Sequence, residues 1–405
     1  MAEHLVIVGG GQAAAQAVQS LRQQNYAGAI TLVSEEPHPP YQRPPLSKKY
    51  LAGELTRERL FLRPASFYAD KAVTLELGRR VEELQLGARR VRLDDGRTLP
   101  FDRLLLATGS RVRRLDVPGA ALNGVHYLRT LADADAIVAS LKPGARVLLV
   151  GAGYIGLEVA AVVRVRGHEV TVLEAADRVM SRTVSPEVAA FYGACHRAAG
   201  VVLHFGTTLA AFRGAASVTA ADTTDGRSFP CDAVIVGIGI VPNVELALAA
   251  GLPCDNGIVV DEFARTADES VIAAGDCTNH PQPLLGRRVR LESVPNAVHQ
   301  GKVAAGTLAG APTAYSEVPW FWSDQYDLKL QIVGLSSGYD EVVLRGDPAT
   351  RSFAAFYLEG GRLLAVDAIN SPREFAAGKK LVASRARIPR EVLADPAVDL
   401  APLTG

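Results

Sequence analysis

Near its N-terminus the chain reads Leu5-Val6-Ile7-Val8-Gly9-Gly10-Gly11-Gln12-Ala13-Ala14. The four leading apolar residues predict a short buried strand, which the three glycines end. A helix-period stretch rich in alanine follows to about Leu21, and residues 30–33 form a second apolar run. This order predicts a βαβ unit whose two strands lie buried in a parallel sheet.

The same pattern returns in the middle of the chain. Residues 147–150 are apolar, Gly151-x-Gly153-x-x-Gly156 follows them, and Glu174 ends the next apolar run. Glycines at these places permit a tight turn and let a pyrophosphate approach the backbone, while the small third residue seats the helix on the strand. The helix N-terminus then offers N–H groups to the phosphates. One match is weak, but two complete copies predict two Rossmann-type dinucleotide-binding domains.

Composition and charge exclude several other classes of protein. Of 405 residues, 48% are hydrophobic and 21% are charged, as in a globular enzyme. Lys plus Arg equals Asp plus Glu, 43 each, so no global charge favours nucleic acid or an anionic membrane. The four cysteines include no CxxC pair, which disfavours a disulfide framework or a clustered metal site. The first strand begins at Leu5, too early for a signal peptide, and glycines and Glu158 interrupt the longest apolar stretch. We expect a cytoplasmic protein without metal.

Two further signatures mark the first copy as the FAD site. The apolar run 104–106 enters the small-residue turn Ala107-Thr108-Gly109, and residues 270–274 lead into Gly275-Asp276. An Asp at the carboxyl end of a strand lies where open α/β sheets bind ligands, and it suits a polyol such as the ribityl chain. The alternative is that Asp276 is an ordinary turn or cap residue.

The complete set of motifs resembles the NADH-dependent ferredoxin reductases of the flavoprotein superfamily related to glutathione reductase. The segments that resemble the superfamily are the two glycine patterns and residues 107–109, 237–239 and 275–277. Those that resemble the NADH-dependent ferredoxin reductases more closely are residues 43–48, 127–130, 292–297 and 321–325. The resemblance implies an α/β fold with a discontinuous FAD domain at 1–112 and 246–316. An NAD domain at 113–245 and a C-terminal α+β interface domain at 317–405 complete it.

The resemblance also implies the residues that contact each cofactor. Those expected around FAD are Gly9, Gly11, Ala13, Ala14, Glu35, Arg43, Lys48, Val81, Ala107, Thr108, Gly109, Arg129, Gly275, Asp276, Val294 and Trp322. Those expected around NADH are Gly151, Gly153, Tyr154, Ile155, Gly156, Glu158, Glu174, Gly237, Ile238 and Gly239. Ala14 stands where many relatives have glycine, a small change because alanine also packs closely.

Two of these residues are the expected catalytic pair. The resemblance places Lys48 near flavin N5 and pairs it with Glu158, where the two charges orient the nicotinamide. The alternative is a surface lysine and a glutamate on a helix surface. The resemblance also aims a helix that begins near Val294 at the flavin, where a positive helix end favours the anionic reduced form. Trp320 and Trp322 pack either at the flavin edge or in a domain core.

The absence of cysteine from one segment bears on which acceptor receives the electrons from the flavin. Disulfide reductases of this superfamily have a redox pair soon after the first βαβ unit, but residues 36–60 contain no cysteine. FAD accepts a hydride as two electrons and releases electrons singly, so an outside one-electron carrier is the natural acceptor. The resemblance implies a [2Fe-2S] ferredoxin that supplies an oxygenase: a haem monooxygenase first, a Rieske dioxygenase or rubredoxin system next.

Such ferredoxins are usually acidic, so a basic patch is expected near the flavin edge. The candidates are Arg63, Arg287, Arg288, Arg290, Lys302, Lys379 and Lys380. Glu174 would accept hydrogen bonds from the ribose and repel a 2′-phosphate, which favours NADH over NADPH. The alternative is that Arg178 and Arg182, just beyond it, weaken this preference. Two other functions stay open: an NADH oxidase or peroxidase that uses oxygen species, and a redox sensor resembling apoptosis-inducing factor.

Overall fold

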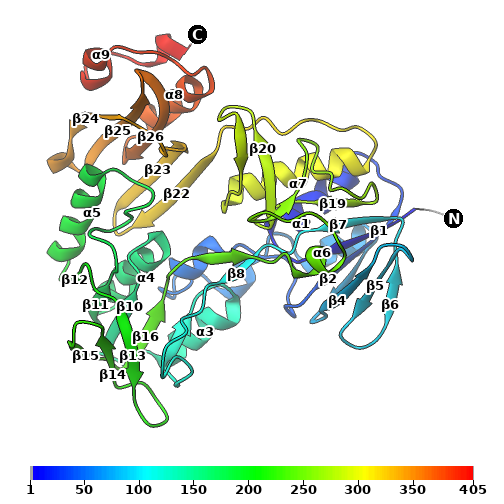
Figure 1. The fold of residues 1–405 in the computed structure, drawn as a ribbon, viewed down its shortest axis with the longest axis horizontal. Helices are drawn as coiled ribbons and strands as arrows, with labels where there is room; N and C mark the ends of the chain where they lie inside the picture. The colour runs from blue at the N-terminus through cyan, green and yellow to red at the C-terminus, as the bar shows by residue number, and fades with distance from the viewer. Residues whose placement is uncertain (1–2, 405) are drawn as a thin grey trace. The chain divides into compact units, whose positions relative to one another are not determined.

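The computed structural model describes residues 3–404 (Figure 1), and the chain forms two compact units. Unit 1 contains residues up to 42, 57–111 and 241–319, and unit 2 contains residues 43–56, 112–240 and those from 320 on. Strands β8 (Ser110–Val112) and β17 (Ile240–Pro242) lie where the chain passes from one unit to the other.

Unit 1 is built on a five-stranded parallel sheet with the order β19-β7-β1-β2-β3. The helix α1 packs along α7, and both contribute to the core that lies against this sheet. The parallel strands and helices are β1 (His4–Val8), β2 (Ala29–Ser34), β3 (Val73–Leu77), β7 (Arg103–Leu106), β19 (Val271–Ala273), α1 (Gln12–Gln23), α2 (Ala65–Asp70), α6 (Glu245–Ala249) and α7 (Val294–Leu308).

Two small sheets complete unit 1. The first, antiparallel, contains β4 (Val81–Gln85), β5 (Arg90–Leu93) and β6 (Thr98–Pro100), and the second contains β18 (Ile258–Val259), β20 (Thr278–Gln282) and β21 (Arg287–Val289). The central strand β1 is paired in register on both sides, since Val8 lies opposite Val33 on β2 and Leu106 on β7. The carboxyl ends of β1, β2 and β7 therefore meet at one edge of the sheet, as the sequence predicted for the first glycine turn.

Unit 2 repeats this design and adds a second sheet. Its parallel sheet has the order β12-β11-β10-β16-β9, and its antiparallel sheet has the order β22-β23-β26-β25-β24. The strands of the parallel sheet are β9 (Val125–Tyr127), β10 (Arg146–Val150), β11 (Glu169–Leu173), β12 (Val202–His204) and β16 (Ala233–Val236). Its helices are α3 (Leu131–Ser140), α4 (Tyr154–Val165) and α5 (Pro186–Ala198). A small antiparallel sheet is formed by β13 (Leu209–Arg213), β14 (Ala220–Thr223) and β15 (Ser228–Pro230).

The C-terminal part of unit 2 is the expected α+β domain. It consists of β22 (Trp320–Gln325), β23 (Leu328–Gly334), β24 (Glu341–Asp347), β25 (Ser352–Glu359), β26 (Arg362–Ile369), α8 (Pro372–Ala383) and α9 (Arg390–Ala394). One buried core runs from Leu149 and Tyr192 of the parallel sheet and its helix to Phe353 and Tyr357 of the antiparallel sheet. The two-Rossmann fold class with a C-terminal α+β domain is confirmed.

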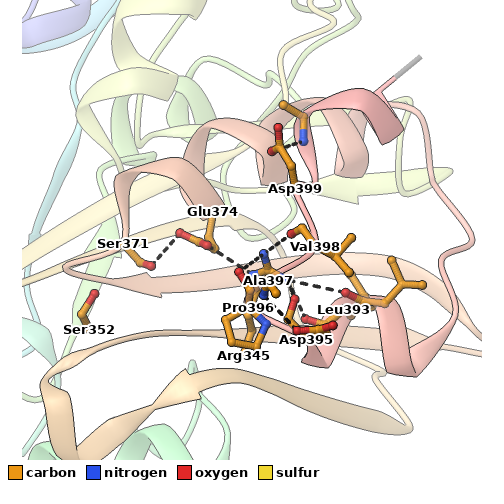
Figure 2. Close-up of polar contacts among 12 residues, drawn as sticks. Arg345, Ser352, Ser371, Glu374, Leu393, Asp395, Pro396, Ala397, Val398 and Asp399 are labelled. Atoms are coloured by element: carbon orange, nitrogen blue, oxygen red, sulfur yellow. Dashed lines mark hydrogen bonds and ion pairs between the residues drawn. The ribbon is translucent and has the colours of Figure 1, made fainter.

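The end of the chain is tied to the antiparallel sheet by Arg345, a buried arginine on β24 (Figure 2). Its Nε lies 3.2 Å from Glu374 Oε1 on α8, and its terminal nitrogens donate to backbone carbonyls of the last segment. Those carbonyls belong to Leu393, Asp395, Pro396 and Val398. A planar guanidinium with five N–H donors suits such a set of acceptors.

No helix in residues 3–404 is both long enough and apolar enough to cross a membrane. No three His, Cys, Asp or Glu side chains in the same range gather as ligands for a metal ion.

Candidate dinucleotide-binding sites

The first glycine turn lies at the carboxyl end of β1 in unit 1. Gly9 has φ +121°, and a Cβ there would lie 2.1 Å from the carbonyl oxygen of Ala107, so only glycine fits. Gly11 is the N-cap of α1, but no side chain caps the helix, and a Cβ on Gly11 would meet nothing within 4 Å. Free space in front of uncapped N–H groups is what a pyrophosphate requires.

The other residues expected around the first turn also lie at this edge. Ala14 is fully buried in the core, as its role in seating the helix requires, and Ala13 is nearly so. Glu35 follows β2 directly and is exposed, which leaves its carboxylate available to ribose hydroxyls. Val81 begins β4 and is buried.

The Gly275-Asp276 turn is fixed by hydrogen bonds to the side chain of Gln300 on α7. The Gln300 side-chain oxygen accepts from the Gly275 N–H at 2.6 Å and from the Thr278 hydroxyl at 2.8 Å, and its amide nitrogen lies 2.8 Å from His280 Nδ1. Asp276 Oδ2 accepts from the Ser110 hydroxyl at 2.9 Å. A buried amide therefore fixes the backbone beside the carboxylate that we expect to hold the ribityl chain.

The Ala107-Thr108-Gly109 turn is fixed by a second amide. Thr108 Oγ1 donates to the Asn243 carbonyl at 2.7 Å, and the Asn243 amide donates back to the Thr108 carbonyl at 2.9 Å. Sequence reasoning missed Asn243 and Gln300, because each acts across the fold on a turn that is far away in sequence.

Helix α7 begins at Val294, as the sequence predicted, and Pro295 stands at the start of it. The Ser293 hydroxyl caps the helix by accepting from the Asn296 N–H at 3.2 Å. Asn296 is buried, and its side-chain oxygen has no hydrogen-bond partner. A buried acceptor without a partner costs free energy unless a bound group donates to it, so this position suits a ligand.

The second glycine turn, in unit 2, has the same geometry as the first. Gly151 has φ +103°, and a Cβ there would lie 2.5 Å from the Gly237 carbonyl oxygen. Gly156 touches Gly151 closely, whereas Gly153 faces open space as the uncapped N-cap of α4. Next along the helix, Ile155 is 44% exposed, so its side chain is accessible at this turn.

Glu174 lies at the carboxyl end of β11 with both oxygens fixed by the backbone. Oε2 accepts from the Ala152 N–H at 2.6 Å, and Oε1 accepts from the Ala176 N–H at 2.8 Å. Each carboxylate oxygen can accept more than one hydrogen bond, so this arrangement orients the group and leaves it able to bind hydroxyls. The neighbouring Arg178 pairs through Nη1 with Asp177 at 3.0 Å, while its buried Nε has no hydrogen-bond partner.

Lys48 and Glu158 form an ion pair in unit 2. Lys48 Nζ lies 2.7 Å from Glu158 Oε2, and the side chains are 16% and 1% exposed. Lys48 follows the short helix η1 (Pro44–Ser47), whose prolines restrict the backbone. The Ser47 hydroxyl donates to Glu158 Oε2 at 2.5 Å, and the Ser323 hydroxyl donates to Oε1 at 2.7 Å. The glutamate is thus buried and fully hydrogen-bonded, and the alternative of an exposed helix-surface glutamate was wrong.

Arg43, Arg129 and Trp322, three further residues expected to contact FAD, lie in unit 2. Arg43 Nη1 donates to the Arg129 carbonyl at 2.8 Å, so these two segments are joined. Trp322 is half-buried on β22, with its ring centroid 5.6 Å from that of Trp320. Lys379 Nζ lies 4.2 Å from the Trp320 ring centroid, within cation–π range. Both tryptophans are therefore partly exposed rather than central core residues.

The cysteines offer no reactive thiol. All four are free, and Cys277 is fully buried beside the Gly275-Asp276 turn, as expected of a small core residue. Burial raises the pKa of the Cys277 thiol, and burial also raises the pKa of Cys231 to about 11. A thiol kept protonated in this way is a poor nucleophile.

The residues present fit the two dinucleotides that the fold class binds. Each glycine turn has an uncapped helix N-terminus with free space before it, and a glutamate follows the next strand in each copy. In unit 1 the orphaned Asn296 oxygen and the Asp276 carboxylate add acceptors of the kind that a flavin nucleotide needs. Together these features define a two-dinucleotide oxidoreductase.

Comparison with known proteins gives the family. Residues 3–301 match the pyridine nucleotide-disulphide oxidoreductase family, to which the chain belongs, and residues 320–404 match the reductase C-terminal domain. The protein is accordingly an oxidoreductase that uses FAD and a nicotinamide dinucleotide.

The chain is similar over its whole length to ferredoxin reductases. It is 46% identical to rhodocoxin reductase of Rhodococcus erythropolis, covering 98% of this chain and 93% of the relative. It is 44% identical to putidaredoxin reductase of Pseudomonas putida, covering 98% and 96%. The reductase in the crystal structure of the covalent putidaredoxin reductase–putidaredoxin complex superposes with a TM-score of 0.96, at 44% identity and with 98% and 97% covered. The resemblance predicted from the motifs is confirmed.

Proposed function

We propose that this protein is an NADH-dependent ferredoxin reductase that supplies single electrons to a [2Fe-2S] ferredoxin of an oxygenase system. The observation on which the proposal depends is the pairing of two glycine turns with a complete lack of cysteine in residues 36–60. Electrons that enter from NADH have no thiol in that segment to receive them, which favours an external one-electron carrier as the acceptor. The relatives named above support the same reading.

In this function the FAD domain comprises 1–112 and 246–316, the NAD domain 113–245, and the interface domain 317–405. The first glycine turn, Asp276 and the start of α7 would hold FAD, whereas the second turn and Glu174 would hold NADH. FAD supplies the chemistry that converts a two-electron hydride into single electrons. We assign the protein to the cytoplasm, where NADH and reduced thiols prevail.

Lys48 and Glu158 are the proposed catalytic pair. A buried glutamate held by three donors fixes the lysine ammonium in one place. A fixed positive charge near the reacting atoms favours the arrival of negative charge there, and it costs no reorganisation during the reaction.

Glu174 supports NADH rather than NADPH as the electron donor. Its carboxylate is anchored by two backbone N–H groups and cannot swing away from a 2′-phosphate without breaking them. Repulsion between the two anions would then disfavour NADPH.

An acidic ferredoxin is proposed to dock on basic side chains. The exposed candidates are Arg63, Arg287, Arg288, Lys302 and Lys380, and Lys379 is half-exposed beside Trp320. Arg288 is less suited, since its guanidinium donates to the Val260 carbonyl at 2.6 Å. Arg290 pairs with Glu292 at 2.6 Å and is only 12% exposed, so its charge is largely neutralised.

Stopped-flow absorbance tests the proposal. The purified protein is reduced with NADH without oxygen and then mixed with [2Fe-2S] ferredoxins of acidic surface. Rapid flavin bleaching followed by ferredoxin reduction is expected. In a parallel mixing with air-saturated buffer, fast reoxidation of the reduced protein, together with no transfer to any ferredoxin, would instead establish the oxidase. A long-lived reduced complex that reduces neither acceptor would establish the redox sensor.

A further inference from the structure

A line of buried polar side chains leads away from the Lys48–Glu158 pair through unit 2. From Glu158 Oε1 it passes to Ser323 Oγ at 2.7 Å, and from there to Gln325 Nε2 at 3.2 Å. Gln325 Oε1 lies 2.9 Å from His196 Nε2, and His196 Nδ1 lies 3.3 Å from the Tyr326 hydroxyl. Ser323, Gln325 and His196 are 0%, 1% and 0% exposed.

The direction of every hydrogen bond in this line is fixed by the carboxylate at its end. An ionised carboxylate only accepts, so Ser323 must donate to it and must itself accept from the Gln325 amide. The Gln325 oxygen then faces His196 and requires a donor, which makes the Nε2–H tautomer the one that fits. His196 Nδ1 is left as an acceptor for the Tyr326 hydroxyl.

The amide of Gln325 has no unused donor. One of its two N–H groups points to Ser323, and the other has Met180 Sδ at 4.0 Å. Since an amide does not release its protons at neutral pH, the line orients its members rather than conducting protons. Burial lowers the pKa of His196, which keeps the ring neutral as the Nε2–H form requires. Hydrogen bonds aligned in one direction polarise one another, most strongly where water is excluded.

We propose that Tyr326, His196, Gln325 and Ser323 form a one-way hydrogen-bonded chain that holds the Glu158 carboxylate, and through it the Lys48 ammonium, in place for hydride transfer. Ser323, Gln325 and His196 are thus positioning residues, supplied by β22 and α5 to a glutamate on α4. This inference rests on the proposed function of the Lys48–Glu158 pair, and it adds three residues that touch neither cofactor in that function.

A nested set of variants tests the chain. Ser323→Ala is expected to slow the limiting rate of flavin reduction by NADH about tenfold, because it removes a hydrogen bond to a charged group. The NADH dissociation constant should stay within about twofold, and Ser323→Thr, which keeps the hydroxyl, should restore most of the rate. Gln325→Leu and His196→Asn are expected to slow the same step in the parent protein.

The decisive comparison is made in the Ser323→Ala background. If Gln325 and His196 act through Ser323, their substitution there should cost nothing further, whereas independent structural damage would add to the loss. Additive slowing would overturn the proposal. Gln331→Leu, on the neighbouring strand β23, and His168→Asn, at another buried histidine, are matched controls that should leave the rate unchanged.

A spectroscopic measurement on the holoprotein tests the hydrogen-bonded chain independently of the proposed function. Nitrogen-15 chemical shifts of labelled histidine, assigned through His196→Asn, should show His196 as the Nε2–H tautomer without titration from pH 6 to pH 8. If His196 is the Nδ1–H tautomer, the proposed hydrogen-bonded chain is refuted, whatever the rates of flavin reduction in the variants. If Glu158→Gln leaves flavin reduction unchanged while the Nε2–H tautomer is present, the catalytic role of the ion pair fails and the chain is retained only as structure.

Discussion

Lys48 Nζ lies 2.7 Å from Glu158 Oε2, and the glutamate in this pair is 1% exposed while the lysine side chain keeps 16%. The charge that is almost removed from water is therefore the one with three donors, from Lys48, Ser47 and Ser323. Burial of a carboxylate is tolerated only with such compensation. The lysine end of the pair is the one that can still reach a bound molecule.

Substitution of either partner should damage both stability and hydride transfer. Lys48→Met leaves the buried glutamate without its counter-ion and should destabilise unit 2 by about 3–5 kcal/mol. We expect flavin reduction by NADH to slow at least about tenfold, as measured by stopped-flow absorbance. Lys49→Met, at the next residue, is the control and should behave as the parent protein. A parent-like reduction rate in Lys48→Met would exclude the lysine from catalysis.

The pairing of Lys48 with Glu158 was predicted from the family resemblance, but the residues around the pair were not. Short glycine patterns and a proline at the first turn of a helix report local backbone needs, which is why both turns and the start of α7 could be predicted from sequence. Ser323, Gln325, Asn243 and Gln300 act on residues far away in the chain, and no local pattern encodes those contacts. The docking charges could be predicted only in part. A sequence shows where arginines cluster, but it does not show that Arg290 is already paired with Glu292.

Glu174 should control the choice of nicotinamide dinucleotide. Replacing it with Ala removes the repulsion of a 2′-phosphate, so kcat/KM for NADPH should rise about tenfold while that for NADH falls. The ratio of the two kcat/KM values is the measurement. Glu169→Ala, at the opposite end of β11, is the matched control and should leave the ratio unchanged. An unchanged ratio in Glu174→Ala would show that another group selects the dinucleotide.

Asp367 should make stability fall as pH rises through neutrality. Its Oδ2 accepts from the Tyr357 hydroxyl at 2.5 Å, its Oδ1 has no partner, and burial raises its pKa to about 7. Because the folded protein holds this proton more tightly than the unfolded chain, the contribution to stability is complete below about pH 4 and is lost as pH rises through 7. The shift of about three pKa units corresponds to about 4 kcal/mol.

Asp367→Asn keeps an acceptor for Tyr357 but cannot ionise. The melting temperature of the variant minus that of the parent should therefore increase between pH 5 and pH 8.5. Asp327→Asn, at an exposed carboxylate in the same unit, should show a difference that does not change with pH. A constant difference for Asp367→Asn as well would mean that this carboxyl does not titrate in the range.

Reduction of the ferredoxin should be sensitive to salt, whereas reduction of the flavin should not. Steering between a basic patch and an acidic partner weakens as the screening length falls to about 10 Å at 0.1 M salt. Lys380→Gln, at an exposed position, should lower the second-order rate constant at low salt and have little effect at high salt. Arg290→Gln is the informative comparison, because its ion pair with Glu292 already cancels its charge. Equal effects of the two substitutions would contradict this assignment of the docking charges.

Arg345 should hold the last segment of the chain on the C-terminal sheet (Figure 2). The side chain is 5% exposed, pairs with Glu374 on α8 and satisfies carbonyls between Leu393 and Val398. Arg345→Met leaves these carbonyls without their donor and Glu374 with the Ser371 hydroxyl but without its counter-ion, which should cost about 3–5 kcal/mol. The loss should appear as faster hydrogen exchange and proteolysis in residues 390–404, while flavin reduction by NADH is retained because the site residues in unit 2 keep their own contacts.

Arg362→Met removes a more exposed arginine that pairs with Glu359 at 2.7 Å, a contact worth under about 1 kcal/mol, and should leave exchange in that segment unchanged. If both variants release the segment equally, its attachment does not depend on Arg345.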